Sequence, residues 1–108
     1  MSSFPPIIFS VGTTPVLLLS KKESRKQYIV VYPSTSKVAA NTGIVYLGIG
    51  MVPTATGGNT SAGHIMQPGE SFGESDSSPQ NNIYDVSKEA IYAVASTSGQ
   101  ILEVYEVV

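Results

Sequence analysis

Apolar and polar positions alternate with a period of two along several short segments of the chain. The alternation is clearest in residues 43–51 (GIVYLGIGM), where Val45, Leu47 and Ile49 share one side, and in residues 100–108 (QILEVYEVV). Successive side chains of a β-strand point to opposite faces, so a repeat of two is typical of a strand with one buried face. Both segments are therefore predicted to be strands.

Shorter apolar runs bounded by turn-forming residues predict further strands. Residues 14–20 (TPVLLLS) and 27–32 (QYIVVY) are rich in aliphatic or aromatic side chains, and residues 89–96 (EAIYAVAS) alternate small and large ones. Weaker strand patterns lie at residues 7–11, 64–67 and 71–73. The predicted fold class is all-β: a single small antiparallel β-sandwich or barrel of about seven to eight short strands.

The pattern also suggests a division of the chain into two parts. Residues 1–12 are predicted to form an extended N-terminal arm, and residues 13–108 the β-sandwich domain. The arm carries Phe4 directly before Pro5 and Pro6. Because proline restricts the backbone to extended conformations, a stiff segment with one aromatic anchor is a suitable docking element.

Glycine marks two tight turns between predicted strands. In residues 63–72 (GHIMQPGESF), Pro68 fixes φ near −65° and Gly69 tolerates the positive φ of a type II turn. A phosphate-binding loop would need several glycines leading into a helix, and no helical pattern follows. Residues 97–99 (TSG) are predicted to be a hairpin loop that joins the last two strands.

Composition narrows the classes of partner. Only 13% of the 108 residues are charged, about half the usual share, and the net charge is −2, so nucleic acid is not an expected partner. The longest aliphatic run, residues 16–19, is far too short to cross a membrane, and residues 1–6 lack the features of a signal peptide. The absence of cysteine excludes disulfides and thiolate metal sites.

Charge is distributed unevenly, and this points to one candidate binding surface. Four of the six basic residues are Lys21, Lys22, Arg25 and Lys26, which lie between two predicted strands. This run is either a solvated turn or a contact with a partner. Tyr105 alternates with core positions of the last strand, and an outward orientation would make it part of an interface patch.

No candidate catalytic, cofactor-binding or metal site emerges from the sequence. His64 is the only histidine and has no neighbouring acids in the sequence that would complete a metal site or a catalytic triad. Glu70, Glu74, Asp76 and Asp85 are close enough in sequence to suggest a cation-binding loop at residues 74–82, but the spacing of a calcium loop is incomplete. We therefore expect a protein without cofactors that is not an enzyme.

The order of several fragments resembles a small β domain that recurs in structural proteins of tailed bacteriophages. The pattern runs R-x-x-φ-x-φ, V-Y-φ-G-φ-G, G-φ-φ-φ-P-G-E-S, I-Y-A-φ-A-S, and a glycine turn before a last strand that ends in Glu. The matching segments are residues 25–30, 45–50, 63–71, 91–96 and 99–106. The chain departs from the pattern at Tyr32-Pro33, where the family has Asn, and in long loops at residues 53–63 and 74–82.

The resemblance implies a virion component that binds the major capsid protein, with no catalytic residues to carry over. The favoured role is a capsid decoration (cement) protein on the exterior of the head, made in the host cytoplasm and assembled as a homotrimer. Two alternatives stay open: a carbohydrate-binding or host-surface module on a head or tail fibre, and a head–tail connector or tail component. The residues expected to contact the partner are Phe4, Pro5, Pro6, Lys21, Lys22, Arg25, Lys26 and Tyr105.

Overall fold

The computed structural model describes residues 6–54, 63–75 and 86–108. These residues form eight strands and one short 3-10 helix, and the prediction of an all-β chain is confirmed. The elements are β1 (Ile7–Val11), β2 (Val16–Leu19), β3 (Gln27–Val31), β4 (Val45–Ile49), β5 (Gly63–Met66), β6 (Ser71–Ser75), η1 (Val86–Lys88), β7 (Ile91–Ala95) and β8 (Gln100–Val107).

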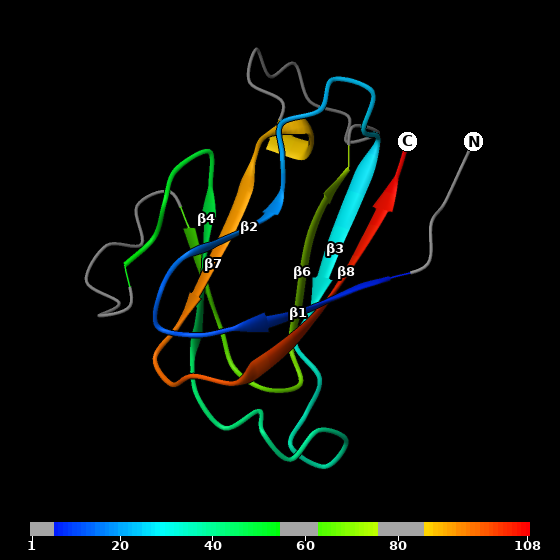
Figure 1. Cartoon of the computed structure of the whole chain (residues 1–108). Coiled ribbons are helices and arrows are strands. Elements are labelled where there is room, and N and C mark those ends of the chain that lie inside the picture. Colours follow the sequence, from blue (N-terminus) through cyan, green and yellow to red (C-terminus); the bar gives the residue numbers. More distant parts are fainter. Residues whose placement is uncertain (1–5, 55–62, 76–85) are drawn as a thin grey trace.

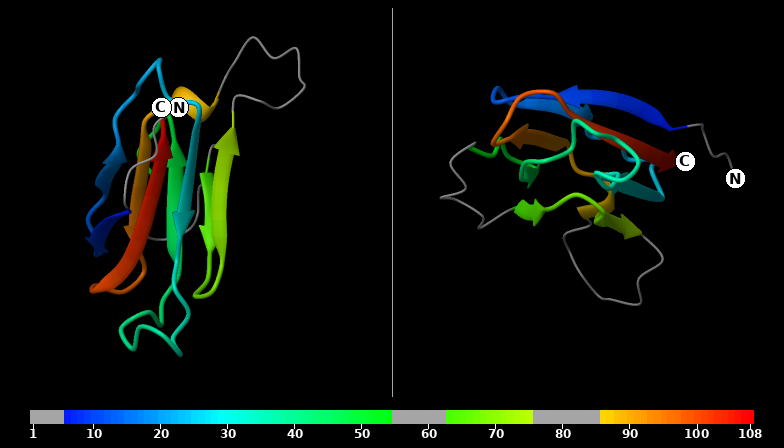
Figure 2. Two further views of the ribbon diagram at one scale, coloured as in Figure 1. Left: turned by 90° about the vertical axis from the view of Figure 1, so that its right-hand side faces the viewer. Right: turned by 90° about the horizontal axis from the view of Figure 1, so that it is seen from below.

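The strands form two antiparallel four-stranded sheets, which pack face to face as a sandwich. One sheet has the order β1-β8-β3-β6 and the other the order β2-β7-β4-β5; they lie on the right and on the left of Figure 1, respectively. Figure 2 (left) looks onto the first sheet, whose strands can be followed by colour. This pair of strand orders is that of the eight-stranded jelly roll, a fold used by viral capsid proteins, lectins and cupins.

Six of the seven connections between consecutive strands cross from one sheet to the other, and only β4 and β5 form a hairpin. The predicted hairpin at residues 97–99 is therefore wrong, because β7 and β8 belong to different sheets. Gly99 has a φ of 82°, which permits the sharp change of direction. A local glycine signal identifies a turn, but it does not reveal whether the strands that it joins pair with each other.

The Pro68-Gly69 turn has the predicted type II character. Gly69 has a φ of 98°, and the Glu70 amide donates to the Gln67 carbonyl oxygen at 3.1 Å. The Gly69 amide also donates to the Tyr32 carbonyl oxygen at 2.7 Å. The turn thus leads from β5 in one sheet to β6 in the other and is held against the end of β3.

The predicted boundary of the N-terminal arm needs correction. Residues Ile7–Val11, within the range assigned to the arm, form β1 and pair with β8 from Ile7–Val104 to Val11–Gln100. Val11 is fully buried and Phe9 packs against the core, so apolar burial draws this segment into the sheet. Of the three residues expected to anchor the arm, only Pro6 lies within the described part of the chain, and it is exposed.

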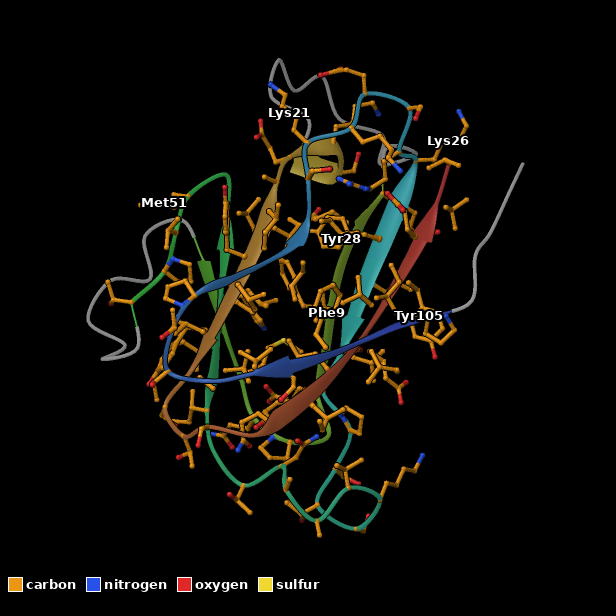
Figure 3. All side chains as sticks on the ribbon, in the orientation of Figure 1. Phe9, Lys21, Lys26, Tyr28, Met51 and Tyr105 are labelled. Carbon is orange, nitrogen blue, oxygen red and sulfur yellow. The ribbon has the colours of Figure 1, made fainter. Side chains whose placement is uncertain are left out.

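The core lies between the two sheets and is built from the inward positions of the alternating strands. Leu102 and Val104 of β8 are buried, as are Val45 and Leu47 of β4. These are the positions that the period-two pattern assigns to one face. Figure 3 shows the side chains between the sheets, including those of Phe9 and Tyr28.

A buried polar network closes one end of the sandwich, next to the loop of residues 33–44. Gln100 Oε1 accepts hydrogen bonds from the Thr42 and Gly43 amides at 2.9 and 3.0 Å and from the Tyr32 hydroxyl at 2.6 Å. Asn41 is also buried; its side-chain amide donates to the Pro33 carbonyl oxygen, and its Oδ1 accepts from the Ile101 amide. The loop backbone is therefore hydrogen-bonded by side chains where no sheet is available.

Candidate interaction surface

The basic run at residues 21–26 is divided between the interior and the surface. Arg25 is 0% exposed, and its guanidinium donates to Glu106 Oε2 at 2.9 Å. It also donates to the carbonyl oxygens of Ser20 at 2.6 Å, Glu89 at 3.1 Å and Ser87 at 3.4 Å. The prediction that Arg25 contacts a partner is wrong, because its charge and its donors are already used inside the domain.

Glu106 is the counter-charge of both Arg25 and Lys22. Lys22 Nζ lies 3.2 Å from Glu106 Oε2, the same oxygen that accepts from Arg25. Burial alone would raise the pKa of Glu106, but hydrogen bonds from Arg25 and Lys22, together with their positive charges, outweigh burial and lower this pKa below 4.5. Lys22 is therefore mainly part of this ion pair, although its side chain stays partly exposed.

The lowered pKa of Glu106 predicts acid sensitivity of the fold. Because the carboxylate is favoured in the folded state, its stabilisation is fully present above the unfolded pKa, near 4.5, and is lost as the pH falls through the folded pKa. Urea titrations between pH 7 and pH 3 should show this loss below about pH 4.5. In the variant Glu106→Gln, stability should be lower at pH 7 and the part of the acid dependence due to this group should disappear. Parallel curves for the two proteins would contradict this role of Glu106.

Two further predicted residues, Lys26 and Tyr105, lie on or beside the outer face of the β1-β8-β3-β6 sheet. Lys26 and Tyr105 are exposed, and Figure 3 shows both on this side of the molecule. The Lys26 amide donates to the Val107 carbonyl oxygen at 2.8 Å, which places the basic turn at the end of β8. We call the exposed group of Pro6, Ile8, Lys26 and Tyr105 the terminal surface.

The pairing of β1 with β8 explains how the arm and Tyr105 come together. Ile7 is opposite Val104 and Ile8 opposite Glu103. Continuing this register by one residue places Pro6 beside Tyr105. The Tyr105 hydroxyl donates to Glu103 Oε1 at 3.3 Å, and desolvation, followed by the charge and hydrogen bond of Glu103, raises the pKa of Tyr105. The exposed ring offers an aromatic surface.

His64 has a packing role inside the sandwich. Its ring stacks on that of Phe72, with centroids 4.5 Å apart and an angle of 20° between the planes. His64 belongs to β5 and Phe72 to β6, so the contact joins the two sheets. In the described parts of the chain, no three His, Cys, Asp or Glu side chains gather in a way that would hold a metal ion.

The acidic residues considered for a cation-binding loop fall into two groups. Glu70 Oε1 accepts a hydrogen bond from the Gln67 amide at 2.9 Å and so closes the Pro68-Gly69 turn. Glu74 lies in β6. Asp76 and Asp85, together with most of the loop at residues 74–82, lie outside the described residues.

Two shallow depressions lie along the β1-β8-β3-β6 sheet. One, of about 220 Å³, lies at the end of β3 between Lys37 and Glu103. The other, of about 370 Å³, lies over β3 and β6 and is lined by Gln27, Ile29, Ser71, Phe72, Gly73, Glu74 and Ser75. The second depression offers amide, hydroxyl and carboxylate groups beside apolar surface.

Sequence reasoning missed a second exposed apolar surface, on the other sheet. Leu17 of β2 and Ile65 of β5 are exposed, as are Met51 and Val52 directly after β4. The signal was present in the sequence, since none of the segments that form this sheet contains a charged residue. It was not recognised because the same pattern is expected of strands that are buried on both faces.

No family model, no curated protein and no solved structure matches the chain. Within residues 6–54, 63–75 and 86–108, no helix is both long and apolar enough to cross a membrane. The fold itself assigns the chain to the class of small jelly-roll domains, and function has to be argued from its surfaces.

Proposed function

We propose that this chain is a structural protein of a tailed-bacteriophage virion, a capsid decoration protein that binds the outside of the head shell as a trimer and stabilises it. The proposal is supported by the ordered motifs of the sequence and by the jelly-roll topology, which viral capsid proteins share. The observation that carries it is the exterior of the domain. Among the described residues, seven large apolar side chains are exposed on two different sides of the sandwich.

Such an exterior suits a protein that works by adhesion. Exposed apolar groups gathered in patches are typical of protein–protein contacts. A component that binds only the assembled shell stabilises it by mass action, by about 2.7 kcal/mol per site at a free concentration of 100 Kd. Many copies on one lattice would add up to a large effect even if each contact is modest.

The terminal surface is the part proposed to contact the major capsid protein. It combines an aromatic ring, an isoleucine and a lysine; Phe4 and Pro5, which precede Pro6 in the sequence, lie outside the described residues. Apolar side chains surrounded by a polar rim are the usual composition of a specific interface. Lys21, exposed in the same basic turn, would supply further charge at the rim.

The proposal predicts a specific loss of binding to heads. The triple variant Lys21→Ser, Lys26→Ser and Tyr105→Ala should bind expanded, undecorated heads of the same phage at least about tenfold more weakly, a change of about 1.4 kcal/mol. Its melting temperature should change little because all three side chains are exposed. Lys37→Ser, on the loop at the opposite end of the sandwich (Figure 1), is the matched control and should bind like the wild type.

Binding is measured by sedimentation of heads with fluorescently labelled protein. Failure of the wild-type protein to bind heads would contradict the proposed function. If the wild type and the triple variant bind heads with the same affinity, another surface contacts the capsid. Electron microscopy of complete particles gives a second test, because density at the head–tail junction instead of on the shell would favour the connector role.

The depression over β3 and β6 favours carbohydrate binding on a fibre as the second candidate. Lectins also use the jelly-roll fold, and sugars are bound by polar groups next to apolar surface. The depression contains this combination, with Gln27, Ser71 and Glu74 beside Ile29. Specific binding on a glycan array, abolished by Gln27→Ala, would support this candidate over decoration.

A further inference from the structure

The sheet β2-β7-β4-β5 contains no charged residue in any of its strands. Their sequences are VLLL, IYAVA, VYLGI and GHIM. The opposite sheet, in contrast, carries Glu74, Glu103 and Glu106. This difference cannot be explained by the core, because both sheets contribute only one face to it.

The register of the strands identifies the residues on the outer face. Leu17 pairs with Tyr92, and Tyr46 pairs with Ile65 on one side and with Val94 on the other. Leu17 and Ile65 are 44% and 42% exposed. Val94 shares this face but is fully buried and is not a member of the core cluster, so the chain itself covers the face at this position.

The segment that follows β4 extends this apolar surface. A side chain at Gly48 would meet the ring of Pro53 at 2.7 Å, so residues 51–53 fold back against the sheet. Met51 and Val52 of this segment are 39% and 51% exposed, and Figure 3 shows Met51 on the opposite side of the molecule from Tyr105. We call the group of Leu17, Tyr46, Met51, Val52, Ile65 and Tyr92 the charge-free face.

An antiparallel sheet with one face in water normally alternates apolar and polar residues, whereas a sheet covered on both faces is apolar throughout. The charge-free face has the second composition. We propose that a second copy of this chain covers it, so that this face is the contact between the copies of the homo-oligomer.

Charge complementarity favours a copy of the chain over a partner with a charged surface. A charged side chain placed against this face would lose its hydration and find no counter-charge, which is costly. An equally apolar face avoids this cost, and every copy of the chain supplies one. Contacts between copies over this face also bring no like charges together.

The size of the face sets a limit on the contact between two copies. Four strands spaced about 4.8 Å apart and about 17 Å long give a footprint on the order of 300 Å². A stable pair usually buries about 800 Å² on each partner, so the contact has to extend beyond the four strands. The segment with Met51 and Val52 supplies further exposed apolar surface beside them.

The experiment measures mass in solution by size-exclusion chromatography with light scattering. The wild-type protein should form a multimer of the 11.4 kDa chain. The variant Leu17→Glu with Ile65→Glu should be monomeric, with its subunit affinity at least about a hundredfold weaker. The control, Ile8→Glu with Tyr105→Glu, adds the same charge to the opposite sheet and should remain a multimer. Circular dichroism verifies that each variant is folded.

A milder variant protects the test against misfolding. Met51→Ser with Val52→Ser changes a loop and leaves every strand intact, and it should also weaken the multimer. A wild-type protein that is monomeric at about 200 μM, or folded variants that all remain multimeric, would overturn the proposal. The proposal is also overturned if the wild type is monomeric and Leu17→Glu with Ile65→Glu abolishes its binding to heads. The capsid protein would then be the partner of this face.

The inference rests on the proposed function at one point, namely that a decoration protein acts as a multimer. The proposed function and the proposed contact between copies can fail separately. A wild-type multimer that needs the charge-free face but binds no heads would contradict decoration and support the contact between copies. Binding to heads by a multimer that persists in all face variants would contradict the contact and leave decoration in place.

Discussion

Replacing Arg25 with alanine is expected to lower the free energy of unfolding by about 3–5 kcal/mol, the largest effect of any substitution considered for this domain. The guanidinium joins Glu106 of β8 to the carbonyl oxygens of Ser20, Ser87 and Glu89. Ser20 follows β2 and Glu106 lies in the opposite sheet, so Arg25 connects the two sheets at one end. Its removal leaves a partly buried carboxylate and several carbonyl oxygens with fewer donors.

Two further variants separate charge from geometry at this position. Arg25→Lys keeps the charge but not the planar group that reaches several acceptors, so it should recover only part of the loss. Lys26→Ala, next to Arg25 but exposed, is the matched control and should change stability by no more than about 0.5 kcal/mol. The measurement is urea denaturation followed by circular dichroism at pH 7. A loss below about 1 kcal/mol for Arg25→Ala would show that the buried guanidinium is not needed to hold this end together.

Much of the fold could be predicted from the sequence because burial and strand geometry act locally. A period of two is visible in any single strand, and it assigned Leu102 and Val104 to one face before the partner strands were known. The strand order could not be predicted in the same way. It depends on which strands meet across the sandwich, and a turn such as residues 97–99 has the same local chemistry whether it forms a hairpin or crosses between sheets.

The candidate site was predicted less well, and Arg25 shows why. A cluster of basic residues in one turn suggests a surface, although one of its members can point inward while its neighbours stay in water. The evidence for a buried Arg25 lay far away in the sequence, since Glu106 shares a face with Leu102 and Val104 and needs a cation there. Arg25 is the only arginine of the chain. The pair is a contact over 81 positions, which a local pattern does not reveal.

The two ends of the sandwich are closed by polar groups in different ways. Arg25 acts through charge at the end that carries the basic turn. At the other end, neutral groups around Gln100 hold the loop of residues 33–44. In the jelly roll almost every connection crosses from one sheet to the other. The backbone groups of these connections have no strand to pair with, so side chains at both ends have to supply their hydrogen bonds. The broad faces are thereby left free to present apolar surface.

Replacing Gln100 with leucine is expected to lower the free energy of unfolding by about 2–4 kcal/mol. The substitution removes the acceptor for the Thr42 and Gly43 amides and for the Tyr32 hydroxyl, and also the donor to the Ser98 carbonyl oxygen. Leucine fills a similar volume, so the loss reports on unpaired polar groups and not on a cavity. The measurement is again urea denaturation at pH 7.

A double-mutant cycle with Tyr32 tests whether the network acts as a unit. Tyr32→Phe removes one of the three donors to Gln100, and in the Gln100→Leu background that donor has already lost this acceptor. The two losses should therefore fall short of additivity by about 0.5–1.5 kcal/mol. Additive losses would show that the hydroxyl gains its stabilisation from the Gly43 carbonyl oxygen, 2.9 Å away, and not from Gln100. The contribution of Gln100 to this end of the sandwich would then come from its hydrogen bonds with the Thr42 and Gly43 amides, without the Tyr32 hydroxyl.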